Sequence, residues 1–450
     1  MKKAIIVAIW AICLAGGIAL AVFAVTVYAK KTFDSVVKDE QFRDLPLYKG
    51  KNVSFSTAED VGGENYLLWV YDTNKEEYDS YRKLLEKNGY ELFADNGEEG
   101  IEGYVYTANY RKGAKKVIVT YLSKLQNAMI TVTEAQEYSD HLIYSDALTE
   151  DNIPGAQTKF IFPELSATGN SFVFQLKNGH YIVNDGGYKK DLLPLLDLLD
   201  EYNPNEGKPV IEAWVVSHAH LDHMGCLTEL TQNPEFGSRI IVEGLYYTAA
   251  SDDANEERRG TTPMQSLTNL VIMSHAAMRN SKGEVTPIYR FRTGERYYFS
   301  DITMDVTYTQ DLLNYKEWST SNAQSTVLMY TIEGQKVYIT ADSDYECQML
   351  TLDIYDDEYF DVTIYQAPHH SGNTNDQFTR HLTVQTVISP SKGLPSGAGG
   401  MISRYAQYQH LAEKAQEVLS FLEGGVIFTF PYEVGTYERL PLIDWTKYEE

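Results

Sequence analysis

The sequence predicts an α/β fold, a sandwich of sheets covered by helices, preceded by a small α+β domain and an N-terminal transmembrane anchor. Three observations support this prediction. The chain begins with a long uncharged run, its second half alternates strand and helix patterns, and several apolar strand patterns there end in histidine or aspartate. A chain of 450 residues is also too long for one small module, which favours two or three domains.

The composition restricts the kinds of chemistry available. With 63 acidic and 38 basic side chains, the chain has a formal charge of −25. Such an acidic protein repels phosphate backbones, so general nucleic-acid binding is disfavoured. Three cysteines cannot form a disulfide framework or a cysteine-rich zinc site. Any metal site must therefore use other ligands.

Residues 1–31 are predicted to be a transmembrane signal-anchor. The 26 residues from Ala4 to Ala29 carry no charge, and as a helix they would extend about 39 Å, enough to span a bilayer. Lys2 and Lys3 favour a cytoplasmic N-terminus, which places the rest of the chain outside the cell membrane. The alternative is a signal peptide cleaved after Val27-Tyr28-Ala29, which would give a secreted protein.

Three segments are predicted between the anchor and the second half of the chain. Residues 32–53 show no clean periodicity and are interpreted as a stalk. Residues 54–137 form a predicted small α+β domain, with strand patterns at 66–71, 103–110, 117–122 and 128–133 and a helix pattern at 75–88. This domain lacks a cluster of catalytic residue types, which favours a spacer or a module for an unidentified protein partner. Residues 138–156, which contain Asn152-Ile153-Pro154-Gly155, are a predicted linker.

Residues 157–450 form the predicted α/β domain. Strand patterns lie at 171–176, 180–184, 211–217, 239–242, 326–331, 336–340, 361–366 and 386–389, and helix patterns lie at 190–202 and 412–422. Strands separated by helices in this way favour a sandwich of sheets covered by helices.

A dense group of metal-binding side chains follows one of these strands. The apolar segment Trp214-Val215-Val216 runs into Ser217-His218-Ala219-His220-Leu221-Asp222-His223. Alternation along an extended strand end points His218 and His220 to one side, where they can grip one cation. The following turn swings Asp222 and His223 toward a second cation. The spacing therefore predicts a site for two metal ions.

Two further strand patterns end in metal-binding residue types. The apolar run at 337–341 ends at Asp342, and the run at 362–368 ends at His369 and His370. We expect these strand ends to converge on one rim. Asp342 also fits the N-cap of a following helix, and the two roles are compatible.

Residues 157–436 resemble the metallo-β-lactamase fold superfamily. The resemblance is closer to the subgroup with the metallo-hydrolase domain of the competence DNA-uptake protein and the teichoic-acid phosphorylcholine esterases. It rests on Gly169-Asn170-Ser171, the Asp185-Gly186-Gly187 turn, the His218–His223 motif, Asp342 and His369-His370-Ser371-Gly372. The resemblance implies an αββα sandwich with two divalent metal ions, zinc or manganese.

The resemblance also implies a role for each site residue. The motif leaves open which of His369 and His370 binds a metal, and His369 is chosen here. One metal would then be held by His218, His220 and Asp342, and the other by Asp222, His223, Asp342 and His369. Asp222 would also orient the attacking hydroxide, and His370 would protonate the leaving group.

The chain departs from the superfamily pattern in ways that bear on the first metal. Many members have a further histidine ligand, and the nearest candidate here, His275, lies in a helix pattern typical of a surface or packing residue. Glu243, directly after the strand pattern at 239–242, is a candidate for a substitute oxygen ligand. Cys226 is interpreted as buried packing, and His410 as either a late ligand or a helix-surface residue.

The expected function is a membrane-anchored extracytoplasmic hydrolase of a small or wall-linked phosphoester or phosphodiester, acting through a metal-bridging hydroxide. A competence-type nuclease is the main alternative, although the acidic composition argues against it. Lactone or lactam hydrolysis is a further enzyme class. A metal-stabilised binding module with little catalysis is the alternative outside enzymes.

Overall fold

A computed structural model of the chain describes residues 40–56, 59–60, 65–134, 137–248, 271, 274–313, 321–372, 375–391 and 406–448. The predicted anchor at 1–31 lies outside these residues. Within the described part of the chain, no helix is long and apolar enough to cross a membrane. The described strands form three sheets, one in a small domain at 40–134 and two in a large domain at 157–448.

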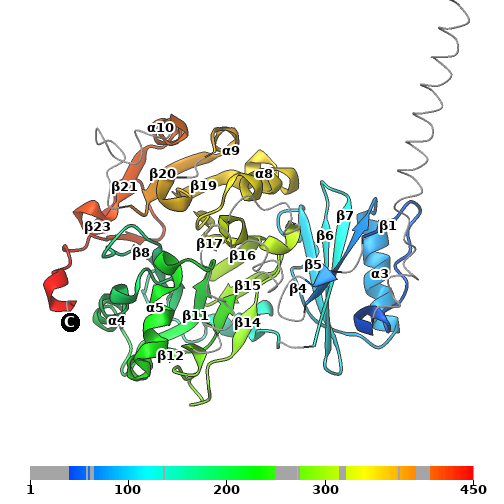
Figure 1. Cartoon of the computed structure of the whole chain (residues 1–450), viewed down its shortest axis with the longest axis horizontal. Helices are drawn as coiled ribbons and strands as arrows, with labels where there is room; N and C mark the ends of the chain where they lie inside the picture. The colour runs from blue at the N-terminus through cyan, green and yellow to red at the C-terminus, as the bar shows by residue number, and fades with distance from the viewer. Residues whose placement is uncertain are drawn as a thin grey trace, which may run out of the picture.

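The small domain is an antiparallel sheet with one helix on its outer face (Figure 1). The helix α3 (Lys75–Lys87) begins after Asn74, whose side chain accepts a hydrogen bond from the Glu77 amide. Its apolar face buries Tyr78, Tyr81 and Leu85. The sheet contains β1 (Ser54–Phe55), β2 (Glu59–Asp60), β3 (Tyr66–Tyr71), β4 (Glu91–Asp95), β5 (Val105–Lys112), β6 (Lys115–Leu122) and β7 (Asn127–Thr133).

The described part of the predicted stalk packs against this small domain. Phe42, Leu45 and Tyr48 are buried in the core between α3 and the sheet. The Tyr48 hydroxyl also lies 2.7 Å from Thr73 Oγ1. These three apolar residues follow neither a helical nor a strand spacing, and charged residues lie among them, so the sequence pattern does not predict their burial. Residues 40–53 therefore belong to the small domain, which corrects their assignment as a spacer.

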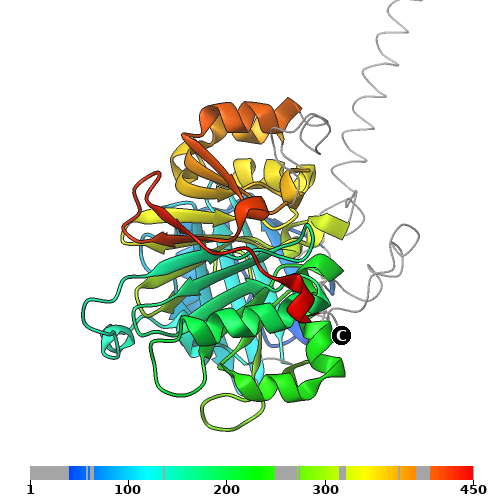
Figure 2. The ribbon, with the colours of Figure 1, turned by 90° about the vertical axis from the view of Figure 1, so that its left-hand side faces the viewer.

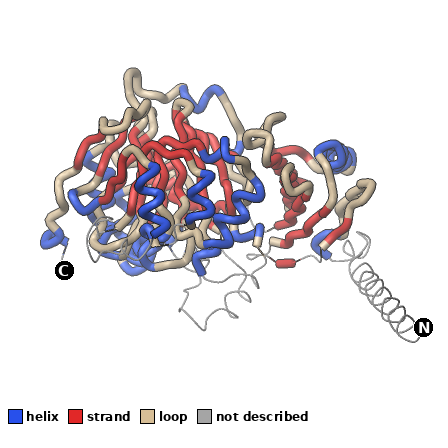
Figure 3. Tube along the Cα trace, turned by 90° about the horizontal axis from the view of Figure 1, so that it is seen from above, coloured by secondary structure: helices blue, strands red, loops and turns tan. Residues whose placement is uncertain are grey.

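The large domain has four layers, helices, sheet, sheet and helices (Figure 2), and Figure 3 shows helices lying across its strands when the molecule is seen from above. The nine-stranded sheet contains β8 (Lys159–Phe162), β9 (Ser171–Gln175), β10 (Tyr181–Asp185), β11 (Val210–Val216), β12 (Ile241–Val242), β13 (Leu245–Tyr247), β14 (Ile288–Arg290), β22 (Val426–Thr429) and β23 (Tyr437–Arg439). The seven-stranded sheet contains β15 (Arg296–Phe299), β16 (Ile302–Tyr308), β17 (Val327–Ile332), β18 (Gln335–Ile339), β19 (Asp361–Gln366), β20 (Thr383–Ser389) and β21 (Glu417–Ser420).

Helices cover the outer face of each sheet. The nine-stranded sheet is covered by α4 (Leu192–Glu201) and α5 (Leu221–Gln232), and the seven-stranded sheet by α8 (Tyr345–Ile354), α9 (Asp376–His381) and α10 (Ala406–Lys414). Between the sheets, aromatic side chains interdigitate, and the Phe174 and Tyr330 ring centroids lie 4.3 Å apart. Every residue of β9 and β10 is buried, as expected for strands covered on both faces.

The C-terminal helix pattern is placed differently from the sequence prediction. Residues 412–422 read as one helix, but α10 ends at Lys414 and β21 follows, parallel to β20. Pairing with β20 satisfies the backbone of this segment and buries Leu419 in the core. The tertiary contact outweighs the helical spacing of its apolar residues.

The two domains share an apolar core. On the inner face of the small sheet, Leu67 and Met129 belong to the same buried cluster as Tyr338 and Phe360 of the large domain. Polar contacts add to this interface, since Lys124 Nζ donates to the Leu352 and Tyr355 carbonyls at 3.0 and 2.8 Å. The predicted linker is also packed, with Ser139 Oγ 2.7 Å from the Tyr246 hydroxyl and Leu142 buried.

This shared core changes the expected behaviour of the isolated large domain. A chain beginning at Gln157 would expose the cluster to water and should melt at least about 10 °C below a chain beginning at Glu40, or aggregate. Calorimetry of the two chains measures the difference. Equal melting temperatures would mean that the large domain folds independently of the small domain, as the predicted linker at 138–156 implies.

Glu295 makes stability depend on pH. The carboxyl accepts hydrogen bonds from the Arg292 amide and the Tyr297 hydroxyl. Burial raises its pKa from 4.5 to about 7 despite these contacts. The pKa of Glu295 is higher in the folded than in the unfolded protein, so the protonated carboxyl contributes its full stabilisation below pH 4.5. The free energy of unfolding should fall by about 3 kcal/mol as the pH rises from 4.5 to 7.

The Glu295→Gln variant tests this dependence. Glutamine is uncharged at every pH, so the variant should lack this fall in the free energy of unfolding between pH 4.5 and 7. Urea denaturation at a series of pH values measures it. An unchanged slope would mean that Glu295 ionises normally in the folded protein.

Candidate metal centre

The His218–His223 motif lies where strand β11 passes into helix α5. Ser217 to His220 continue beyond the end of β11, and His220, with φ −98° and ψ 149°, is still extended at the N-cap of α5. Asp222 and His223 occupy the first turn of the helix. The change from extended to helical backbone thus directs the two pairs of side chains differently, as the spacing predicts.

The remaining candidate residues follow β18 and β19. These neighbouring strands are parallel, so their C-terminal ends lie at one edge of the sheet. The Gln366 side chain joins the two ends, because its Nε2 donates to the Ala341 carbonyl at 2.8 Å and its Oε1 accepts from the Thr340 amide at 2.8 Å. Asp342 and the histidine pair at 369–370 are therefore brought to one place.

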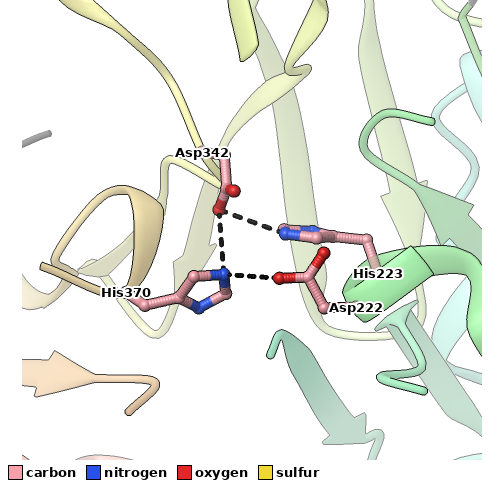
Figure 4. Close-up of side chains that lie close together, drawn as sticks. All are labelled: Asp222, His223, Asp342 and His370. Carbon is pink, nitrogen blue, oxygen red and sulfur yellow. Dashed lines mark hydrogen bonds and ion pairs between the residues drawn. The ribbon is translucent and has the colours of Figure 1, made fainter. Parts of the chain in front are cut away.

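Two groups of potential ligands share Asp342. One contains Asp222, His223, Asp342 and His370, and the other contains His218, His220 and Asp342. Within each group the candidate ligand atoms lie within 4.8 Å of one another. Figure 4 shows the Asp342 carboxylate facing both His223 and His370. The structure thus brings five of the six predicted metal ligands together with His370.

The two oxygens of Asp342 face different groups. Oδ1 lies 3.1 Å from His223 Nε2 and 3.6 Å from His370 Nε2. Oδ2 lies 3.8 Å from His218 Nε2. His370 Nε2 is also 2.9 Å from Asp222 Oδ2. One carboxylate oxygen for each group is the geometry of a ligand bridging two cations.

The structure exchanges the positions expected for His369 and His370. His370 is 4 % exposed, and its Nδ1 lies 3.1 Å from the Pro390 carbonyl, so that Nε2 faces Asp342 and Asp222. The His369 side chain is 40 % exposed and lies outside both groups, although its Nε2 is 3.7 Å from Asp342 Oδ2. This geometry favours His370 as the ligand and corrects the choice of His369.

Asp185 orients His223 from behind. Asp185 Oδ2 lies 2.8 Å from His223 Nδ1, and its two oxygens accept from the amide and hydroxyl of Ser217. A proton on Nδ1 leaves His223 Nε2 as the ligand atom. That atom is buried and faces Asp342 Oδ1 at 3.1 Å, which fits a nitrogen and a carboxylate oxygen that hold the same metal ion.

The charges of the cluster also fit a divalent cation. Burial raises the pKa of Asp342, but His223 and His370 lower it more, so the net pKa is well below the usual value. Burial lowers the pKa of His223, but Asp342 and Asp185 raise it more, so the net pKa is well above 6.5. Burial and the neighbouring His223 lower the pKa of His218. Buried imidazoles beside several carboxylates form a donor set suited to zinc or manganese.

Four other candidates lie outside both ligand groups of the described chain. His275 Nδ1 lies 2.9 Å from the Thr286 carbonyl, and Glu243 Oε1 accepts from the Ser281 amide. The thiol of Cys226 is buried, and burial raises its pKa well above the usual value. His410 lies on α10, with its Nε2 4.0 Å from Asp376 Oδ1.

Several polar residues at the centre have no role in the sequence interpretation. Ser321 Oγ lies 2.7 Å from His220 Nε2, and Ser325 Oγ accepts from the Asp342 amide at 3.2 Å. Asn170 Nδ2 lies 3.5 Å from Asp342 Oδ1. Residues 321–326 form a largely polar run directly before the apolar strand β17. This pattern in the sequence indicates polar side chains at the start of a core strand, and it could have identified Ser321 and Ser325.

Comparisons with known proteins agree with the motif. Residues 167–381 match the family model of the metallo-beta-lactamase superfamily, and both ligand groups lie inside this range. Among solved structures, the metallo-beta-lactamase fold protein YhfI from Bacillus subtilis is similar to this chain, with 13% identity, a TM-score of 0.36 and coverage of 61% of this chain and 100% of that chain. No curated protein matches the chain. Residues 167–381, just under half of the chain, are therefore similar to the metallo-beta-lactamase superfamily, whose members are mostly metal-dependent hydrolases.

Proposed function

We propose that the protein is a membrane-anchored hydrolase with two divalent cations that cleaves a phosphoester or phosphodiester outside the cytoplasm. The observation that carries the proposal is the pair of ligand groups sharing Asp342. The anchor and the extracytoplasmic orientation rest on the uncharged run at 4–29 and on Lys2 and Lys3.

The side chains divide into two ligand sets. His218, His220 and Asp342 would hold one cation, and Asp222, His223, Asp342 and His370 the other. Bound there, two divalent cations would supply Lewis acidity, both to activate water and to stabilise phosphoryl oxygens.

Two residues are proposed to move or position protons. Asp222 Oδ2 lies 2.9 Å from His370 Nε2, which leaves Oδ1 to accept a hydrogen bond from the attacking water. His369 is exposed at the edge of the cluster, 3.7 Å from Asp342 Oδ2, where a leaving group can reach it. We therefore assign the proton transfer to the leaving group to His369, in place of His370.

The charge of the chain supports a small or wall-linked substrate. With a formal charge of −25, the protein repels a phosphate polymer along the whole length of the polymer. A single phosphate group experiences mainly the local field of the cations. Within the subgroup that the chain resembles, the teichoic-acid phosphorylcholine esterases favour cell-wall phosphoesters, whereas the competence DNA-uptake protein favours the nuclease alternative.

A substrate panel tests the proposal with the full chain in detergent. Chromogenic phosphodiesters and a phosphorylcholine ester should be cleaved with added manganese or zinc, while linear and supercoiled DNA stay intact. His220→Ala should abolish the turnover, because it removes a ligand of the three-residue group. His381→Ala, an exposed histidine paired with Asp357, is the matched control and should retain it.

Two results would redirect the assignment. DNA cleavage that depends on His220, without ester turnover, would favour the nuclease. Full metal content without any turnover would favour a metal-stabilised binding module. Proteolysis of intact protoplasts tests the orientation separately, since a protected large domain would contradict its extracytoplasmic placement.

A further inference from the structure

A cavity lies in the large domain, apart from both ligand groups. It has a volume of about 240 Å³ and lies between α4 and the C-terminal segment 440–448. Figure 1 shows this segment beside α4, and the Tyr448 hydroxyl donates to Asp197 Oδ2 at 2.8 Å. None of the residues in the two ligand groups lines the cavity.

The walls combine apolar side chains with carboxylates. The apolar part includes Leu165, Leu195 and Leu440, all buried. The acidic lining residues outnumber the single lysine, Lys447, and are Glu164, Asp191, Asp197, Glu201 and Asp444. Asp197 is paired with Arg239, but the other four carboxylates still outnumber Lys447, so this cavity with apolar sides excludes anions and favours an organic cation.

A buried serine hydroxyl in the cavity wall has no hydrogen-bond partner among the described residues. Ser171 lines the wall and is 1 % exposed, and its hydroxyl has no hydrogen-bond partner within the described residues. Buried hydroxyls are normally paired, so this one calls for a partner. Nearby on the same wall, Asp191 accepts from the amides of Ser166 and Tyr188 at 2.8 and 2.7 Å.

We propose that this cavity binds a small primary alkylammonium compound. The alkyl body would lie along the leucines, and the ammonium group would donate to Ser171 Oγ and to the carboxylates of the wall. A neutral alcohol gains no charge attraction, and a quaternary ammonium has no N–H to donate.

The energetics of Asp191 agree with a bound cation. Burial raises the pKa of this carboxyl, although hydrogen bonds from Ser166 and Tyr188 and the charge of Lys190 oppose the increase. Since the net pKa stays raised, an ammonium in the cavity would further stabilise the ionised carboxylate.

Neighbouring residues of the chain reach the cavity and the metal centre. Ser171 begins β9 and lines the cavity, while the preceding Asn170 reaches Asp342. Asp185, which orients His223, and Asp191 lie at the two ends of one connecting segment. The cavity residues are nevertheless outside the ligand groups, so the proposal does not depend on the proposed hydrolase activity.

Calorimetric titration of the full chain without added metal tests the proposal. The probes are n-hexylammonium, n-hexanol, hexanoate and n-hexyltrimethylammonium. Hexylammonium should bind at least about tenfold more tightly than each of the others. Equal binding of hexanol or of the quaternary compound, or no binding of hexylammonium, would overturn the proposal.

Variants place the binding in this cavity. Ser171→Ala and Glu201→Gln should each weaken hexylammonium binding at least about threefold, because they remove an acceptor and a wall charge. Glu206→Gln changes an exposed carboxylate outside the lining and should bind like the wild-type chain. Thermal melting confirms that each variant is folded. Equal affinities for all variants would locate the binding elsewhere and overturn the assignment.

Discussion

Replacing Asp342 with asparagine is expected to remove bound metal and any hydrolysis together. Asp342 is 1 % exposed, and its two oxygens face His223 and His218 in different ligand groups. Asparagine keeps the shape but loses the negative charge, and its amide NH₂ must face one of these imidazole nitrogens. We expect metal affinity to fall at least about 100-fold and turnover on the order of 1,000-fold.

Elemental analysis after dialysis and a phosphodiester assay measure the two effects. Asp357→Asn is the matched control, because Asp357 is an exposed aspartate of the same domain that pairs with His381. Circular dichroism checks that both variants are folded. If Asp342→Asn retained metal and turnover at the level of the control, Asp342 would be excluded from the centre.

The sequence predicts most of the clustered His and Asp side chains, because these residues follow strand ends. Alternation in β11 and the start of α5 fix the directions of His218, His220, Asp222 and His223 from local geometry alone. The position of Asp342 follows from the parallel strands β18 and β19. The first rule is local, whereas the pairing of β18 with β19 is a tertiary contact between strands separated in sequence by α8.

The choice between His369 and His370 needs the tertiary structure. Both follow β19, and both have a left-handed backbone, with φ of 51° and 53°. Non-glycine residues seldom adopt this conformation, so strand alternation does not predict where their side chains point. The contact between His370 Nδ1 and the Pro390 carbonyl, 20 residues away in sequence, fixes the ring.

The same distinction separates correct from incorrect fold predictions. The pattern for β3 coincides with the observed strand, because its continuous apolar run packs on both faces of the sheet, with Leu67 in the core shared with the large domain and Leu68 in the core beneath α3. The segment Glu417–Ser420 becomes a strand only through its pairing with β20. Likewise, the sequence of residues 40–53 is typical of a stalk, and only the packing of Phe42 and Tyr48 against α3 shows that they belong to the small domain. Long-range partners decide these two segments.

Alanine substitutions of the two histidines should have opposite signatures. His370 lies in the ligand group with Asp222, so His370→Ala should lower the bound metal from two equivalents to about one and reduce turnover on the order of 1,000-fold. His369 lies outside both groups, so His369→Ala should retain the metal. It should still lower turnover by about 100-fold, because a proton donor to the leaving group is lost.

The two variants control for each other. Alanine meets nearly the same backbone strain at φ 51° and 53°, so a difference between them reports the side chain and not the turn. A substrate with an acidic leaving group needs no proton donor and should restore the turnover of His369→Ala, while His370→Ala stays inactive. Metal loss in His369→Ala with metal retained in His370→Ala would make His369 the ligand, as the sequence alone suggested.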